Sequence, residues 1–348
     1  MCLLTLVKTV ITNSPESYFP PRTTNLQTWF LNPPLIPISS SNSTLLNLTN
    51  FQFLLNNASK CSGPEPIFFI ILVHSAPLHF SERQTIRETW GSITSLKGHS
   101  IRLIFLLGVG TTNQAKISEE SQKFGDIVLG SFTDSYRNLT YKHLMGYKWV
   151  LTYCPHPSFI LKTDDDAFID LFQLFRLVTS TYGAYYRESS SLSSGVEKTD
   201  TLLLCNVFPQ GTPPVRFNDT KGIKWSVTRE EYPFSEYPKY CGGLAYIATP
   251  SVVEQLYNVS AKVKFLWIDD VFVTGVIREI IGVEPYYMNL RYTYEPQNYR
   301  KWLQERKTLR KIPFMIVHVE RGRKLKEEMQ HLWNKSVRVW RPTFGIIQ

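Results

Sequence analysis

The chain has 348 residues, a length that fits one large α/β domain with a tail, or two small domains. Hydrophobic residues make up 43% of the sequence and aromatic residues 14%, which is enough for a substantial core and excludes wholesale disorder. The formal net charge of +9 favours an anionic partner, such as a phosphate-bearing substrate, a membrane surface or nucleic acid. Because no zinc-finger or RNA-recognition signature accompanies the basic residues, we expect no nucleic-acid partner.

Seven Asn-x-Ser/Thr sequons favour a glycoprotein of the secretory pathway. They lie at Asn42, Asn47, Asn57, Asn138, Asn218, Asn258 and Asn334. The five cysteines show no CxxC spacing, so the sequence gives no zinc site. In an oxidising compartment they allow one or two disulfides, whose pairing the sequence does not give.

The first 63 residues differ in composition from the rest. The sequence contains no run of about 20 apolar residues, so it predicts no complete transmembrane helix. Residues 1–7 are apolar but are interrupted by Lys8, which leaves two interpretations open, the remnant of a signal anchor or a frayed terminus. The segment that follows is rich in Ser, Asn, Thr and Pro and predicts an extended stem.

Four aromatic residues in this segment are unusual for a linker and are candidates to dock onto the following domain: Trp29, Phe30, Phe51 and Phe53. We place the boundary after residue 63. Residues 64–348 then form one globular domain.

In the first half of that domain, short apolar runs alternate with amphipathic segments. The predicted strands are Ile67–His74, Ile101–Gly108, Asp126–Gly130 and the run Phe159–Leu161. The predicted helices are Ser81–Trp90, Asn113–Phe124 and Asn138–Tyr153. This alternation predicts a parallel sheet between two layers of helices, a three-layer α/β fold. Ligands of such sheets bind at the carboxyl ends of the strands.

The second half is less regular. The predicted helices are Leu171–Tyr185, Ser251–Tyr257, a segment ending near Ile281, and Lys324–Trp333. The predicted strands are Leu202–Val207, Ile223–Thr228, Leu244–Thr249 and Pro313–Val319. An aromatic loop, Tyr232–Gly243, ends in Gly242 and Gly243, which would let the backbone approach a ligand closely or would serve a tight turn. Its tyrosines could stack on sugar rings or form a hydrophobic plug.

Three consecutive carboxylates, Asp164, Asp165 and Asp166, follow the strand that ends near Leu161. Adjacent carboxylates repel one another unless a cation lies among them, and oxygen ligands suit a hard divalent ion such as Mn²⁺ or Mg²⁺. An acidic surface turn is the alternative. The apolar residues on both sides of the triplet favour a metal site at the rim of a core.

A second acidic pair, Asp269 and Asp270, lies at the start of a predicted helix, where ordinary N-terminal capping is the simpler explanation. Combined with a metal site, one of these residues could act as a base in the displacement of a diphosphate leaving group. Glycoside hydrolysis also uses two carboxylates but needs no metal. The sequence lacks the Gly-x-x-x-x-Gly-Lys loop of phosphoryl transfer and the Gly-x-Ser-x-Gly elbow of α/β-hydrolases.

Seven short motifs, in order, resemble the β-1,3-galactosyltransferase and β-1,3-N-acetylglucosaminyltransferase family. They are Arg83–Trp90, Phe105–Gly108, Asp134–Lys142, Lys162–Asp166, Tyr237–Gly243, Asp269–Gly275 and Val317–His318. Together they extend from about residue 66 to residue 333, which is nearly the whole predicted domain. The resemblance implies a GT-A (Rossmann-like) fold and inverting transfer of a hexose, most readily galactose, from a UDP-sugar to a 3-hydroxyl group.

The resemblance also implies roles for individual residues. Asp166, Asp164 and His318 would bind Mn²⁺, with Mg²⁺ as the alternative ion. Donor binding would fall to Arg83, Arg87, Lys162, Asp164 and Asp165. Tyr240, Gly242 and Gly243 would form an acceptor or donor loop. Asp270, or with less support Asp269, would be the catalytic base.

The family further implies a Golgi membrane location with a lumenal catalytic domain behind a signal anchor and stem, and a glycoprotein or glycolipid acceptor. Asp269 stands where galactosyltransferases of this type usually have Glu, which leaves UDP-N-acetylglucosamine open as the donor. A rival from another class is an inactive glycan-binding or scaffolding protein. The sequence retains every acidic motif residue, which argues against that rival.

Overall fold

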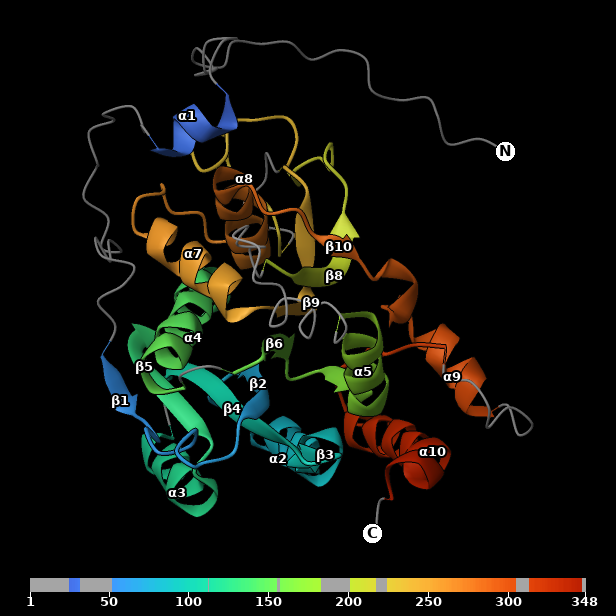
Figure 1. The fold of residues 1–348 in the computed structure, drawn as a ribbon. Helices are drawn as coiled ribbons and strands as arrows, with labels where there is room; N and C mark the ends of the chain where they lie inside the picture. The colour runs from blue at the N-terminus through green and yellow to red at the C-terminus, as the bar shows by residue number, and fades with distance from the viewer. Residues whose placement is uncertain are drawn as a thin grey trace, which may run out of the picture.

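Figure 1 shows the fold as a computed structural model, which describes residues 25–31, 52–111, 113–154, 157–182, 201–216, 224–304 and 313–345. The apolar run at residues 1–7, Cys2, the end of the helix predicted to reach Tyr185, and the sequons at Asn42, Asn47 and Asn218 lie outside these ranges. Within them, no helix is both long enough and apolar enough to cross a membrane.

Four parallel strands form the centre of the main sheet, in the order β5 (Ile127–Thr133), β4 (His99–Val109), β2 (Ile67–His74) and β6 (Phe159–Asp164). The sheet continues from β6 through antiparallel β9 (Tyr240–Ala248) to β8 (Leu203–Phe208) and β10 (Tyr286–Tyr287). The short strand β3 (Ser95–Leu96) pairs with β4. The parallel sheet predicted from the strand–helix alternation is therefore confirmed.

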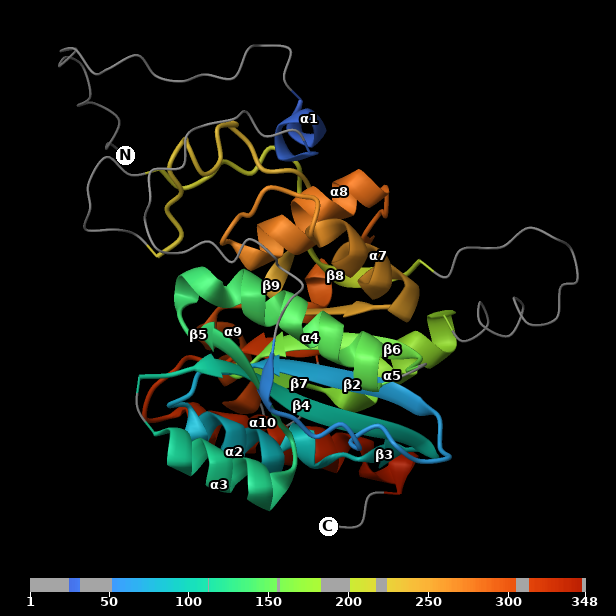
Figure 2. The ribbon, with the colours of Figure 1, turned by 90° about the vertical axis from the view of Figure 1, so that its left-hand side faces the viewer.

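Helices cover both faces of this sheet (Figure 2). One face carries α2 (Phe80–Glu88), η1 (Trp90–Ser92), α3 (Gln114–Phe124), α5 (Leu171–Leu177, continued by η3, Val178–Tyr182) and α10 (Leu325–Phe344). The other carries α4 (Leu139–Tyr153), α7 (Pro250–Ser260) and the helix formed by η4 (Val271–Ile277) and α8 (Arg278–Ile281). Side chains of β2 alternate between the two cores, as the strand period requires. The three-layer α/β prediction is confirmed.

A second, smaller sheet positions the acidic triplet. It consists of β11 (Tyr292–Thr293, preceded by η5, Asn289–Arg291), β12 (Ile316–His318) and β7 (Ala167–Ile169), with α9 (Pro296–Gln304) in the connection. Only residues 165 and 166 separate the end of β6, in the main sheet, from the start of β7, in the small sheet. The triplet therefore lies where the two sheets meet. Antiparallel pairing of β12 with β7 sets His318 opposite Ala167, next to Asp166.

The segment predicted to be an extended stem contributes two packed elements to the fold. In α1 (Leu26–Leu31), Trp29 and Phe30 are buried, and the Phe30 carbonyl accepts a hydrogen bond from the Lys264 amide at 2.9 Å. The predicted docking is confirmed for these two aromatics and for Phe53, which packs partly buried against the same core, whereas Phe51 lies outside the described residues. The strand β1 (Phe53–Leu55) pairs with β5 at the edge of the main sheet.

Two disulfides resolve the cysteine pairing that the sequence left open. Cys61 is bonded to Cys154, which ties the connection before β2 to the end of α4. Cys205 is bonded to Cys241, which joins neighbouring strands β8 and β9.

Three local predictions were wrong. The described part of the segment Ile223–Thr228 is not a strand. Gly242 and Gly243 lie inside β9 instead of in a loop, because that strand already begins at Tyr240. The closing helix α10 continues to Phe344, eleven residues beyond its predicted end, because its apolar stripe continues through Val337 to Phe344 against the core.

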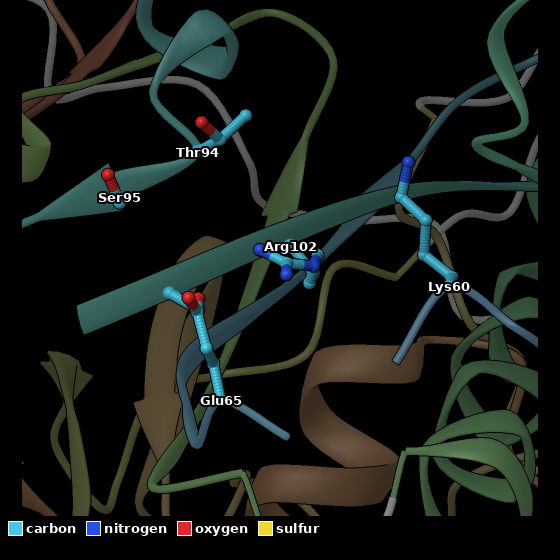
Figure 3. Close-up of a pocket in the computed structure, with 6 residues that line it drawn as sticks. Lys60, Glu65, Thr94, Ser95 and Arg102 are labelled. Atoms are coloured by element: carbon cyan, nitrogen blue, oxygen red, sulfur yellow. The ribbon is translucent and has the colours of Figure 1, made fainter. Parts of the chain in front are cut away.

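A shallow hollow of about 450 Å³ lies at the amino-terminal ends of the central strands (Figure 3). Its lining residues are Lys60, Glu65, Thr94, Ser95, Ser100 and Arg102. Ser100 pairs with Ile67 at the start of β2, whereas the acidic triplet lies beyond the other end of that strand. The eight residues of β2 place the hollow and the acidic triplet roughly 23 Å apart, so this hollow is distinct from the predicted site.

Candidate functional site

The candidate site lies at the carboxyl ends of the two most central strands. In the register of β2 with β6, His74 is paired with Asp164, the last residues of their strands. Asp165 and Asp166 follow in the turn before β7. This is the edge of a parallel sheet at which ligands are expected.

The three aspartates of the triplet have different environments. Asp164 accepts a hydrogen bond from the Nζ of Lys162 at 2.8 Å. Asp165 is fully buried and is held by the Nδ1 of His79 at 2.7 Å and the Nη2 of Arg321 at 2.6 Å. The Oδ2 of Asp166 accepts from the Nε of Arg321, also at 2.6 Å. Asp165 is therefore engaged within the protein, while Asp164 and Asp166 lie at the edge of the site.

Asp166 and His318 together suit one divalent ion. The Nε2 of His318 lies 3.7 Å from the Oδ2 of Asp166. Two ligands at about 2.1 Å from one ion lie at most about 4.2 Å apart, so both can contact the same ion. Among the described residues, no group of three or more His, Cys, Asp or Glu side chains converges on a metal position. The structure therefore brings two of the three predicted ligands, Asp166 and His318, within reach of one ion.

Asp164 and Asp166 also differ in their pKa values. Burial by itself raises the pKa of Asp166, but His318 and Arg321 outweigh it and lower that pKa to about 2. Burial raises the pKa of Asp164 to about 6, against the opposing effect of Lys162. The hydrogen bond to Asp166 is the largest cause of a raised pKa at His318. Asp166 is consequently ionised at neutral pH.

Asp269 is held by a buried hydrogen-bond network that no local sequence motif indicates. Its Oδ2 is 2.9 Å from the Nδ1 of His143, whose Nε2 contacts the hydroxyl of Tyr246, which in turn contacts Tyr147. Burial raises the pKa of Asp269, but the hydrogen bond from His143 and the charge of Lys162 lower it overall. Asp269 is thus an ionised carboxylate without freedom to turn toward a substrate.

Asp270 differs from its neighbour. Its Oδ1 accepts a hydrogen bond from the amide of Val271 at 2.8 Å, and its other oxygen lies beside Gly243. A Cβ atom at Gly243 would lie 3.4 Å from the Oδ2 of Asp270, so the missing side chain leaves room around that oxygen. Burial, followed by the charge of Asp269, raises the pKa of Asp270 to about 7. A carboxylate with this pKa is suited to accept a proton near neutral pH.

Lys162 is a buried cation shared by both acidic groups. Its Nζ donates to the carbonyl of Gly243 and to Asp164. Burial alone would lower the pKa of Lys162, but Asp164 and Asp269 outweigh that effect and raise it. Lys162 therefore joins the end of β6 to β9 and compensates the concentration of negative charge.

Arg83 and Arg87, which were predicted to bind the donor, both have partners within the protein in this structure. Arg83 is fully buried, and its guanidinium contacts Glu120 at 2.6 Å and the carbonyl of Ala76 at 2.7 Å. Arg87 bonds to Glu120 at 2.7 Å and to Asp126 at 2.8 Å. Arg83 therefore ties the β2–α2 loop to α3, and Arg87 ties α2 to α3 and to Asp126 just before β5.

The tyrosines of the predicted aromatic loop pack mainly into the hydrophobic core. Tyr232, Tyr237 and Tyr240 are buried, and Tyr240 stacks on Phe208 with ring centroids 4.9 Å apart. Tyr240 is thus not available to a sugar, which corrects its assignment. At Gly242, a Cβ atom would lie 2.8 Å from Phe208, so this glycine serves close packing.

A different aromatic side chain faces solvent near the acidic pair. Trp225 is 52% exposed and hydrogen-bonds with Tyr136. Burial and the charges of Asp269 and Asp270 raise the pKa of Tyr136, which places this tyrosine close to the carboxylates. Trp225 and Tyr136 were not predicted as site residues, since isolated aromatics in a loop carry no signal in one sequence.

Other residues were missed for the same reason. His79, His143 and Arg321 reach the carboxylates from segments far apart in sequence. Only the position of Arg321 three residues after His318 could have drawn attention to it.

Known proteins resemble this chain over most of its length. The profile of the galactosyltransferase family matches residues 81–289. Beta-1,3-galactosyltransferase 1 of Homo sapiens is 32% identical over 296 residues, covering 83% of this chain and 79% of that protein. Beta-1,3-galactosyltransferase 5 of Pan paniscus is 35% identical over 239 residues, covering 68% of this chain and 72% of that protein. The chain belongs to the galactosyltransferase family.

Solved structures give a weaker likeness. The galactosyltransferase LgtC, in complex with donor and acceptor sugar analogues, covers 76% of this chain and 95% of its own, with 11% identity and a TM-score of 0.37. The bifunctional glycosyltransferase WbbM covers 80% of this chain and 52% of its own, with 10% identity and a TM-score of 0.38. The family assignment therefore rests on the sequence relatives. It confirms the resemblance and the expected class of hexosyltransferase.

Proposed function

We propose that this chain transfers galactose from UDP-galactose to the 3-hydroxyl of an acceptor glycan, in β linkage and with inversion. The names of its relatives support the sugar and the linkage. The observation that carries the mechanism is the contrast between two acidic groups at one sheet edge. Asp166 is held ionised beside His318, and Asp270 has a pKa of about 7.

Asp166 and His318 form the donor end of the proposed site. A Mn²⁺ ion, or Mg²⁺ in its place, bound there would offset the charge that develops on the departing diphosphate. Asp164, paired with Lys162, lies beside this position and is available to the ribose or to water around the ion. Asp165 contributes indirectly, by holding His79 and Arg321 in place.

Asp270 is the proposed base. Its carboxylate removes the proton from the acceptor 3-hydroxyl while that oxygen forms a bond to the anomeric carbon. The bond between the anomeric carbon and the diphosphate oxygen breaks on the opposite face, and UDP leaves with the electron pair. His143 holds Asp269 by a hydrogen bond and leaves its charge beside Asp270, so burial and then this charge raise the pKa of Asp270 to about 7.

We further propose a Golgi membrane location with the enzyme facing the lumen, anchored through an N-terminal segment. The two disulfides support an oxidising compartment. Two sequons, Asn258 and Asn334, are exposed on the described surface, in agreement with a glycoprotein. The acceptor is then a glycoprotein or glycolipid glycan.

The test is a donor screen with purified protein, Mn²⁺ and a panel of β-linked acceptor sugars, with UDP release as readout and NMR of the product for the linkage. UDP-galactose should be the preferred donor and a β-1,3 linkage the product. Asp166→Asn and Asp270→Asn should each lose at least about a hundredfold in turnover. Preference for UDP-N-acetylglucosamine would contradict the donor assignment, and undiminished transfer by both variants would contradict the mechanism.

A further inference from the structure

Arg321 occupies a position that no motif assigned to it. It lies in the connection between β12 and α10, three residues after His318. Its Nε donates to the Oδ2 of Asp166 and its Nη2 to the Oδ1 of Asp165, both at 2.6 Å, while Nη1 contacts the ring of His79 at 2.8 Å. One guanidinium therefore bridges two adjacent carboxylates of the triplet.

This guanidinium and a divalent ion compete for the same oxygen. The Oδ2 of Asp166 is both the acceptor for Arg321 and the atom that lies 3.7 Å from the Nε2 of His318. An ion held between Asp166 and His318 would take this oxygen as a ligand. The Oδ2 of Asp166 cannot accept the hydrogen bond from the Nε of Arg321 and form a metal–oxygen bond of about 2.1 Å in the same direction.

The local structure allows Arg321 to withdraw. Its side chain is 42% exposed, whereas that of Asp165 is fully buried. The next residue, Gly322, has a φ of +134°, a conformation open to glycine, with open space around its Cα. Asp165 and Asp166 are both buried in the short turn between β6 and β7, so the more exposed arginine has more room to move than the two carboxylates.

We propose that Arg321 is the internal counter-ion of the metal-free site, which holds Asp165 and Asp166 in place and leaves Asp166 when a divalent ion binds. This inference rests on the proposed metal role of Asp166 and His318. Its consequence is a reduced affinity for the ion alone, because each binding event must first break the charge-assisted hydrogen bond from Arg321 to Asp166. Arg321 is a positioning residue in this scheme.

The experiment measures Mn²⁺ binding without nucleotide, by titration followed through the electron paramagnetic resonance signal of free Mn²⁺. Arg321→Met should bind Mn²⁺ about tenfold more tightly than the unmodified protein. Arg323→Met is the matched control, since Arg323 is a charged, exposed residue of the same connection and its loss changes the net charge equally. Arg321→Lys keeps the charge but cannot bridge both carboxylates. Its Mn²⁺ affinity should lie between the affinities of Arg321→Met and the unmodified protein.

Thermal unfolding gives a second readout. Without metal, Arg321→Met should melt at a lower temperature than Arg323→Met, because two buried carboxylates lose their counter-ion. Added Mn²⁺ should raise its melting temperature by more than it raises that of the control.

The outcomes separate this inference from the metal assignment. If the unmodified protein binds Mn²⁺ and Asp166→Asn weakens that binding, the metal site stands. Equal Mn²⁺ affinities of Arg321→Met and Arg323→Met would then overturn the role of Arg321 alone. If the unmodified protein does not bind Mn²⁺ even with UDP present, the metal assignment fails and this inference fails with it.

Discussion

At the scale of single residues, the site is defined by neighbouring carboxylates that the fold makes unequal. Asp269 receives a hydrogen bond from His143, which lowers its pKa, whereas Asp270 receives one backbone hydrogen bond and the repulsion of Asp269. Two groups whose pKa values are driven apart in this way can take different roles in catalysis. The geometry thus favours Asp270 over Asp269 as the base.

The first prediction concerns activity and pH. Since Asp270 must be deprotonated to act as a base and its pKa is about 7, kcat/KM should fall about tenfold per pH unit below that value. The measurement is a pH profile of transfer at saturating Mn²⁺. A profile that is flat from pH 5.5 to 8 would contradict the assignment.

The second prediction concerns stability and pH. Because folding raises the pKa of Asp270 from 3.8 to about 7, the folded state binds more protons than the unfolded state between these values. This group therefore destabilises the fold increasingly as pH rises from about 4 to 7. Asp270→Asn, which cannot ionise, should raise the melting temperature at pH 8 by about 2–4 °C or more, and by much less at pH 5. A variant that is less stable at pH 8 would indicate a structural role.

At the scale of elements, helix η4 and strand β9 create the space around the base. Asp270 caps η4, which is wound as a π-helix, an arrangement often found at functional sites. Gly243 in β9 faces Asp270 without a side chain, and the disulfide between Cys205 and Cys241 secures this strand to β8. The exposed indole of Trp225 lies outside this layer, near Tyr136.

The third prediction follows from that exposed indole. We expect the acceptor sugar to pack against Trp225, so Trp225→Ala should raise the acceptor KM about tenfold, equivalent to about 1.4 kcal/mol, with the donor KM unchanged. Tyr287→Ala is the control, because Tyr287 is also an exposed aromatic, at 62%, but belongs to the edge strand β10. An equal effect of both substitutions on the acceptor KM would contradict this role.

At the scale of the whole molecule, the site depends on segments brought together from across the chain. The junction between the main sheet and the small sheet sets His318 beside Asp166, more than 150 residues apart. Elements before residue 64 also belong to the fold, since β1 extends the sheet and Cys61 is bonded to Cys154.

The fourth prediction tests this long-range connection. The Cys61–Cys154 disulfide closes a separation of 93 residues, so the double variant Cys61→Ser/Cys154→Ser should lose about 2–5 kcal/mol of the free energy of unfolding. Because the bond lies away from the acidic groups, the folded variant should keep its turnover at low temperature. Denaturant unfolding and initial rates measure both quantities. A loss of turnover without a loss of stability would contradict this prediction.

The sequence by itself determined the central sheet and the acidic motifs. Strands such as Ile67–His74 are continuous apolar runs, and a strand buried on both faces needs no other information to be recognised. The triplet at Asp164–Asp166 was placed at a strand end for the same reason, because apolar residues give way there to charge. Family resemblance then supplied the reaction.

Only the tertiary structure decided which charges meet. His143 reaches Asp269 and Arg321 reaches Asp166 across 126 and 155 residues, distances in sequence that no local pattern encodes. The same holds for Arg83 and Arg87, whose charge suggested a phosphate partner although Glu120 and Asp126 take their hydrogen bonds. A side chain's charge follows from its type, but its partner and its pKa follow from burial and neighbours, which exist only in the folded chain.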